Sequence, residues 1–243
     1  MIHVQNLSKR FGPRTVLRRI NFEVHEGEFV ALMGPNGAGK TTFLRILASL
    51  SRPSSGKVNI VGYELPAQAT HVRQRLGVVS HQPLLYGDLT AWENLRFYGM
   101  MYNIPDRKKR IDQILELIGL KTRQRDLVRT FSRGMQQRLA IGRAVLHDPE
   151  VLLLDEPHTG LDQSASEMLD KLMVEVAARG RTVIMTSHDL VRAADLASRF
   201  DILSKGKIVA SARADSLSQD GLQAFYRQAL QDHTQAERNG KTS

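Results

Sequence analysis

The chain has 243 residues, of which 42% are hydrophobic and 24% are charged, as in a globular protein with one large domain or two small ones. It contains no cysteine, which excludes disulfides and cysteine-bound metals and makes a reducing, cytoplasmic setting the expected one. The formal charge is +9, but aromatic residues make up only 6% and form no evident base-stacking surface, so no nucleic-acid partner is expected.

The first residues, MIHVQNLSKRFG, lack the basic and then apolar layout of a signal peptide. Partial alternation in MIHVQNL and TVLRRINFEV predicts strands, and the apolar segment FVALM predicts a buried strand before a glycine-rich loop. A helix, KTTFLRILASL, and a further strand, KVNIVG, follow. No apolar run approaches the roughly 18 residues of a membrane-spanning helix, so the chain is not expected to cross a membrane by itself.

From about residue 85 to 145 the pattern is helical. Thr90 and Glu93 predict a capping box at the start of one helix. A second helix, which stops at Gly119, has four apolar residues on one face: Ile111, Ile114, Leu115 and Ile118.

Strands and helices alternate again after residue 145, which favours an α/β fold with a parallel-rich sheet. The segments are EVLLLDEP, a helix over about 163–178, RTVIMTSHD, a short helix, and FDILSKGKIVASA. The last thirty residues are polar and predict one short helix, LQAFYRQALQ, and a frayed tail. We expect a single domain over 1–215, with the helical subdomain at about 85–145, followed by a C-terminal helix and tail over 216–243.

The segment GPNGAGKTT fits the phosphate-binding pattern G-x-x-x-x-G-K-[ST], with a strand before it and a helix after it. Its glycines allow the backbone to turn its N–H groups toward a phosphate. Lys40 would bring a positive charge to the β- and γ-phosphates, and the Thr41 hydroxyl would bind Mg²⁺. The complete loop comprises Gly34, Pro35, Asn36, Gly37, Ala38, Gly39, Lys40, Thr41 and Thr42.

Two carboxylates follow the apolar strand VLLL, at the strand end where α/β sheets bind ligands. Asp155 would hold Mg²⁺, and Glu156 would orient or deprotonate the attacking water. Alone, either carboxylate would be an ordinary acidic strand end. His188 and Gln82 also follow apolar strands. His188 could contact the γ-phosphate, and Gln82 could bind Mg²⁺ or hold the water, although a lone histidine there is more often structural and neither residue is decisive by itself.

A second helix N-terminus suited to anion binding occurs in FSRGMQQR, where Ser132 and Gly134 precede or open a predicted helix. With these pieces in order, the chain resembles the nucleotide-binding subunit of ABC transporters over about residues 2–215. FSRGMQQR occupies the place of the signature motif, usually LSGGQxQR, although Arg133 and Met135 depart from it. The resemblance implies a P-loop NTPase (ABC ATPase) fold with a parallel-rich core sheet, an N-terminal antiparallel β subdomain and the helical insert.

The resemblance also implies roles for individual residues. Phe11 matches the aromatic residue that stacks on adenine, Gln82 the Q-loop glutamine, Asp162 the D-loop aspartate and His188 the switch histidine. Two subunits would pack head to tail, so that Ser132 and Gly134 of one subunit contact the ATP held by the other. We therefore expect an active ATPase that uses ATP and Mg²⁺ and acts as a dimer, with an identical second subunit as the simplest case.

In this family a groove beside the Q-loop receives a helix of a membrane permease. Leu84, Leu85 and Tyr86 are then expected to be exposed docking residues at the cytoplasmic face of the membrane, with ordinary packing inside the helical subdomain as the alternative. SHQPLLYGDLTAWENLRFYGMMY and DEPHTGLD look most like the ATP-binding subunit of the haem exporter of cytochrome c maturation. The short tail leaves no room for the regulatory domain common in importers, which favours export.

Three alternatives remain open. The chain would otherwise power a drug or lipid exporter, act as an ABC ATPase on nucleic acid or ribosomes, or regulate without hydrolysing ATP. A nucleic-acid or ribosome ATPase lacks support because the chain carries neither two ABC ATPase domains nor the sustained heptads of a coiled coil. The third is disfavoured because Glu156 is present.

Overall fold

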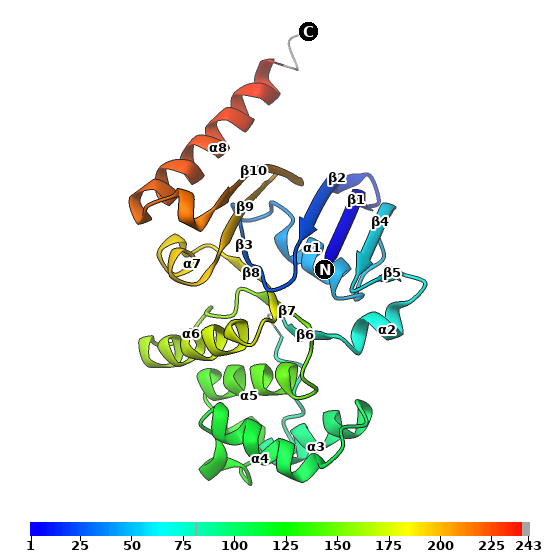
Figure 1. Ribbon diagram of the computed structural model, residues 1–243, viewed down its shortest axis with the longest axis vertical. Helices are drawn as coiled ribbons and strands as arrows, with labels where there is room; N and C mark the ends of the chain where they lie inside the picture. Colours follow the sequence, from blue (N-terminus) through cyan, green and yellow to red (C-terminus); the bar gives the residue numbers. More distant parts are fainter. Residues whose placement is uncertain (81, 240–243) are drawn as a thin grey trace.

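The computed structural model describes residues 1–80 and 82–239, and the strands form two sheets. His81, which is part of the haem-exporter resemblance, and the last four residues of the expected tail lie outside the described residues. Figure 1 shows helices α3 (Ala91–Met101) and α4 (Arg107–Leu117) at one end of the molecule and α8 (Gln219–Asn239) projecting from the other, with the strands between them.

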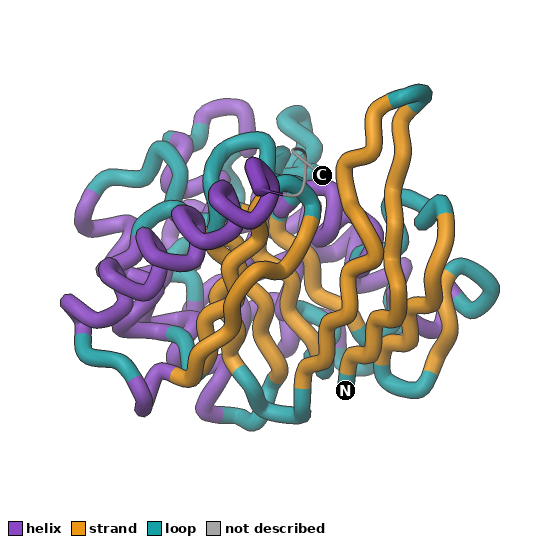
Figure 2. The backbone as a smooth tube through the Cα atoms, turned by 90° about the horizontal axis from the view of Figure 1, so that it is seen from above, coloured by secondary structure: helices purple, strands orange, loops and turns teal. Residues whose placement is uncertain are grey.

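The smaller sheet has four strands in the order β2-β1-β4-β5, and all of its pairs are antiparallel. Figure 2 shows long strands gathered on one side of the molecule and most of the helices on the other. The four-stranded sheet confirms the antiparallel N-terminal part of the expected fold. Its strands are β1 (Ile2–Phe11), β2 (Arg14–Val24), β4 (Ser55–Ile60) and β5 (Tyr63–Leu65).

The larger sheet has six strands in the order β10-β9-β3-β8-β7-β6, and only the β10–β9 pair is antiparallel. Every residue of β3, β7 and β8 is buried, which explains their continuous apolar sequences. The parallel-rich core sheet is therefore confirmed. Its strands are β3 (Phe29–Met33), β6 (Leu76–Val79), β7 (Val151–Asp155), β8 (Thr182–Ser187), β9 (Arg199–Ser204) and β10 (Lys207–Arg213).

The helices lie where the sequence patterns predict them, with a few additions. The helices are α1 (Lys40–Leu47), α2 (Ala69–Arg73), α3 (Ala91–Met101), α4 (Arg107–Leu117), α5 (Arg133–Val145), α6 (Gln163–Ala178), α7 (Leu190–Leu196) and α8 (Gln219–Asn239), and the 3-10 turns are η1 (Lys121–Arg123), η2 (Val128–Thr130) and η3 (Ala214–Ser216). The capping box is confirmed, because Thr90 accepts from Glu93 N at 3.2 Å and the Glu93 carboxylate accepts from Thr90 N at 2.8 Å.

The C-terminal helix is longer than expected. α8 has 21 residues, whereas the sequence pattern predicted a helix of about half that length. Its apolar residues Leu222 and Ala229 are buried, and the polar residues that continue the helix are mostly good helix formers. β5 and α2 were not predicted. The division at residue 215 and the limits of the helical subdomain stay predictions.

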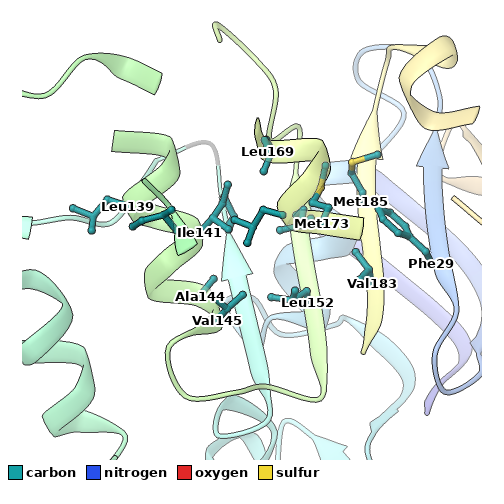
Figure 3. Packing of buried hydrophobic residues seen from close by; sticks show 14 of the residues in the cluster. Phe29, Leu139, Ile141, Ala144, Val145, Leu152, Leu169, Met173, Val183 and Met185 are labelled. Atoms are coloured by element: carbon teal, nitrogen blue, oxygen red, sulfur yellow. The ribbon is translucent and has the colours of Figure 1, made fainter. Parts of the chain in front are cut away.

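Buried side chains on the two faces of the larger sheet form two apolar clusters. Figure 3 shows part of one, in which Ala144 and Val145 of α5 lie beside Leu152 of β7, and Leu169 and Met173 of α6 lie between α5 and Met185 of β8. α5 and α6 are therefore fixed to the strands that end at the predicted carboxylates.

Candidate active site

The glycine-rich loop connects β3 to α1, and a later hairpin supports it from outside. A Cβ atom on Gly34 would lie 2.0 Å from the carbonyl oxygen of Leu203 on β9, so only glycine fits this position. Gly206, in the turn between β9 and β10, donates its N–H to Ala38 O at 2.9 Å. The hairpin of β9 and β10 therefore packs against the loop and supports its shape.

Lys40 is the first residue of α1 and is only 6% exposed. Its Nζ donates to Gly34 O at 2.7 Å and lies 3.9 Å from Oε1 of Glu156. Burial lowers the pKa of Lys40, while the nearby carboxylates of Glu156 and Asp155 oppose that shift. Together with the free N–H groups of the helix start, this cation forms a site for a phosphate.

Asp155 ends β7, and its carboxylate is 7% exposed. Oδ1 accepts hydrogen bonds from Thr186 Oγ1 at 2.8 Å and from Thr41 Oγ1 at 3.2 Å. The three residues meet because β3, β8 and β7 are neighbouring parallel strands whose carboxyl ends share one edge of the sheet. Thr186 was not predicted as a site residue, although a threonine within the apolar strand VIMTS was a usable signal.

Glu156 lies between Lys40 and His188. Its backbone adopts φ +48° and its N–H donates to Thr186 Oγ1 at 2.9 Å, so the residue is held in a conformation that side chains rarely adopt. The carboxylate reaches Lys40 through Oε1, and its Oε2 is 3.6 Å from Nδ1 of His188. His188 is 66% exposed. The predicted catalytic residues Lys40, Glu156 and His188 are therefore together.

Gln82 shares a cavity of about 480 Å³ with both carboxylates. The start of α5 also lines this cavity, through Arg133, Gln136 and Gln137. The cavity borders the carboxyl ends of the strands, where a metal or a water molecule would meet Asp155 and Glu156.

The residues present suit Mg²⁺ bound with a nucleotide. Asp155, Thr41 and Gln82 supply the hard oxygen atoms that this ion prefers, and Thr41 and Asp155 are already in contact. Within residues 1–80 and 82–239, no group of three or more carboxylate or imidazole side chains forms an all-protein metal site. A metal ion here would need phosphate oxygens to complete its shell, as Mg²⁺ does in nucleotide sites.

The family model described as "ABC transporter" matches residues 17–159, more than half of the chain. The chain belongs to the ABC transporter family. Among curated relatives, this ABC subunit is 36% identical over 212 residues to the linearmycin resistance ATP-binding protein LnrL of Bacillus subtilis (strain 168), covering 86% of this chain and 68% of LnrL. It is also 36% identical to the Nod factor export ATP-binding protein I of Burkholderia lata, over 89% of this chain and 72% of that protein.

Solved structures of ATP-binding cassettes are also similar to this chain. An ATP-binding subunit of an ABC transporter superposes with a TM-score of 0.87 at 31% identity, covering 95% of this chain and 99% of the other. An ATP-binding cassette solved as a dimer in a post-hydrolysis state with ADP and Pi superposes with a TM-score of 0.82 at 29% identity. The match covers 88% of this chain and 99% of the other. The expected ABC ATPase fold is confirmed, and the protein is an ATP-hydrolysing subunit of an ABC transporter. None of the helices described in the structure is long and apolar enough to span a bilayer.

The signature segment of this ABC ATPase begins α5. The Ser132 hydroxyl accepts the N–H of Met135 at 3.2 Å, which leaves its own hydrogen available for a phosphate. Asp162 caps α6 by accepting from Ala165 N at 2.8 Å. Arg133 lies against Gly160, where an added Cβ would be 2.6 Å from its Nε. The sequence did not indicate this contact.

Phe11 ends β1 with its ring 54% exposed, and Lys9 Nζ lies 4.7 Å from the ring centroid. The hairpin that carries Phe11 also borders the phosphate loop, since a Cβ on Gly39 would be 2.7 Å from Cδ2 of Leu17. The ring is available for the expected stacking on adenine, which stays a prediction.

The expected docking segment is only partly exposed. Leu84 is 47% and Tyr86 49% exposed, as predicted. The prediction was wrong for Leu85, which is partly buried against the main apolar cluster. The segment therefore alternates between two faces, so that Leu85 anchors the loop while its neighbours point outward.

Proposed function

We propose that this chain powers export, works as a homodimer and associates peripherally with membrane permease subunits at the cytoplasmic face. One observation supports the catalytic part of the proposal: the Glu156 carboxylate lies within 4 Å of both Lys40 and His188, and Asp155 and Thr41 are in contact with each other nearby. The dimeric cassette structure supports the second copy.

The side chains divide the work on ATP. Phe11 stacks on the base, and the loop from Gly34 to Thr42 holds the phosphates by its N–H groups and Lys40. Asp155, Thr41 and Gln82 would hold Mg²⁺, which supplies neutralisation of phosphate charge when bound. Glu156 accepts a proton from a water molecule whose oxygen attacks the γ-phosphorus. The bond from that phosphorus to the bridging oxygen breaks and ADP leaves, while His188 donates to the γ-phosphate oxygens.

The partner subunit would complete the site. Ser132 and Gly134 from one copy close on the γ-phosphate held by the other, and Asp162 lies at the same interface. ATP then favours a closed dimer, and hydrolysis releases it, so that the permease subunits move with each cycle.

For the cargo, a drug or lipid exporter is the better supported type. A resistance ATP-binding protein and an export ATP-binding protein are among the relatives, and roughly a third of each lies outside the match, so tail length does not separate exporters from importers. Haem export is supported only by the similarity of the motif segments to those of a haem exporter, and neither relative named above is a haem exporter.

The permease would dock beside Leu84 and Tyr86. Leu84 lines a small cavity of about 140 Å³ together with Leu50 and Tyr98. Leu50 is 51% exposed, so the cavity rim offers apolar contacts to an incoming helix.

The deciding experiment combines phosphate release with gel filtration. Glu156→Gln should abolish hydrolysis, by about 10³-fold or more, and hold an ATP-loaded dimer, because binding is intact and water is not activated. Lys40→Ala is the control and should stay monomeric with ATP. A Glu156→Gln protein that hydrolyses ATP normally would refute the catalytic assignment. Co-purification of permeases with the tagged chain, with an absorbance spectrum for haem, then tests the cargo.

A further inference from the structure

A cluster of partly buried polar side chains lies at the cavity that Glu156 shares with the start of α7. His158 Nε2 is 2.7 Å from Oδ1 of Asp170, and Arg192 donates through Nη1 to Oδ2 of the same carboxylate. Arg192 also approaches Asp189, with Nε 3.6 Å from Oδ2. The side chains of His158, Asp170 and Arg192 are 14%, 24% and 19% exposed, so these contacts are largely shielded from water.

The cluster joins the two loops that carry the proposed catalytic residues. His158 lies two residues after Glu156, in the loop that leads to α6. Asp189 directly follows His188 and caps α7, where its carboxylate accepts from Arg192 N at 3.1 Å. Asp170 belongs to α6, between the two loops. A continuous chain of contacts therefore runs from the Glu156 loop through α6 to the His188 loop.

Helix α6, which carries Asp170 in the middle of this series of contacts, is anchored in the apolar core. Leu169 and Met173 anchor it in the larger apolar cluster (Figure 3), to which Leu172 also belongs. Its position does not require a buried carboxylate, and burying charges is costly unless they are paired. The network consequently contributes orientation more than it contributes helix stability.

His188 depends on such support. Its side chain is 66% exposed, so packing does not fix its position. Nδ1 of the ring lies 3.6 Å from Oε2 of Glu156. His158, Arg192, Glu156 and His188 all line one cavity of about 280 Å³, together with Asp189. A displacement of either loop would therefore change the distance between Glu156 and His188.

We propose that Asp170 is a positioning residue for ATP hydrolysis, which fixes the loops of Glu156 and His188 relative to each other through His158 and Arg192. The inference rests on the proposed roles of Glu156 and His188. Oδ1 of Asp170 accepts from His158 in the Glu156 loop, and Oδ2 accepts from Arg192 of α7, whose N-cap Asp189 follows His188, so both oxygens are required. An asparagine would offer one acceptor and turn its NH₂ group toward the other donor, which breaks one of the two links.

The test compares Asp170→Asn with Glu175→Gln. Glu175 lies on the same helix and pairs with Arg179 at 2.6 Å, but both side chains are about half exposed, so this substitution removes a carboxylate without touching the network. Asp170→Asn should lower kcat about 10-fold with little change in the KM for ATP, since misplaced catalytic groups cost rate while the phosphate loop is untouched. Glu175→Gln should match the unmodified protein.

A spectroscopic measurement separates positioning from stability. In protein with isotope-labelled histidine, the His188 ring signal, assigned by its loss in His188→Gln, should shift in Asp170→Asn and remain in place in Glu175→Gln. If Asp170→Asn does not fold, His158 provides the second pair. His158→Gln keeps a donor for Asp170 and should retain kcat within about two-fold, whereas His158→Ala should lose about as much as Asp170→Asn.

Equal kcat values and unmoved His188 signals in Asp170→Asn and Glu175→Gln would overturn the proposal. So would a rise in KM at unchanged kcat. The underlying catalytic assignment fails separately, when Glu156→Gln still hydrolyses ATP. A hydrolysis-dead Glu156→Gln combined with a normal Asp170→Asn would reject the positioning role alone.

Discussion

Gly34 shows how a single residue ties the phosphate loop to the rest of the chain. Gly34→Ala should sharply weaken nucleotide binding and lower Tm, because its Cβ would meet the Leu203 carbonyl at 2.0 Å and neither backbone segment can yield. Gly37→Ala is the matched control: it also has positive φ (+78°), but a Cβ there meets nothing within 4 Å. It should cost only the backbone strain of about 1–2 kcal/mol. Equal losses in nucleotide titrations and thermal melts would contradict the steric explanation.

His147 gives the stability of the protein a pH dependence. It stacks on Tyr102 at 3.8 Å, and its Nε2 lies 3.0 Å from Leu76 O, which makes Nε2 the donor and leaves the buried Nδ1 without a partner. Burial lowers the pKa of His147 from 6.5 to about 4. Between these values the unfolded chain binds a proton that the folded chain excludes, so the free energy of unfolding falls as pH decreases from 6.5 to about 4, by up to about 3 kcal/mol.

Urea unfolding at several pH values measures this effect. His147→Gln removes the titrating ring and should flatten the decline over that window, relative to the unmodified protein. A variant with an unchanged slope would show that other groups cause it.

The predictability of the site residues follows from their place in the chain. Asp155 and Glu156 stand at the end of an apolar strand, and Lys40 belongs to a glycine-rich pattern between a strand and a helix, so strand pattern and motif spacing were sufficient to find them. Thr186, Gly160 and the supporting role of Leu203 were missed because each depends on a contact between distant segments. Leu85 was misjudged for a related reason: three consecutive apolar or aromatic residues in a loop do not reveal which one faces the core.

At the scale of elements, α8 is the part that sequence pattern described least well. Its buried face consists of few residues, and the polar remainder resembled an unstructured tail. β3, β7 and β8 were easier, since strands buried on both faces read as continuous apolar runs. β5 and α2, with three and five residues, are too short to show any period.

The buried face of α8 carries a testable stability. Leu222 is 1% exposed, so Leu222→Ala should lower the free energy of unfolding by about 2–4 kcal/mol through lost burial and the cavity it leaves. Gln223→Ala, on the exposed side of the same turn, should change it by no more than about 0.5 kcal/mol. Chemical denaturation of both variants is the measurement, and similar values would mean that α8 does not pack as described.

At the scale of the whole molecule, Arg199 links the two sheets. From β9 it donates to Glu23 O on β2 at 2.7 Å, to Glu28 at 2.9 Å and to Asp201 at 2.9 Å. Asp201 is 2% exposed. Arg199→Met should therefore destabilise the protein by about 3–5 kcal/mol, mainly by leaving a buried carboxylate without its partner.

A double variant checks this reason. Asp201→Asn added to Arg199→Met removes the stranded charge and should recover part of the loss, as seen by denaturant unfolding. Strictly additive losses would indicate that the two residues act separately.

The turn between β9 and β10 also determines when the protein can work during its own synthesis. The glycine-rich motif leaves the ribosome early, but two contacts that shape it come from Leu203 and Gly206, about 165 residues later. A nascent chain that ends before this turn carries the whole motif without the wall that holds it. Nucleotide affinity should thus arise late in translation, after β9 and β10 have joined the larger sheet. A partly made chain would not compete with finished subunits for ATP.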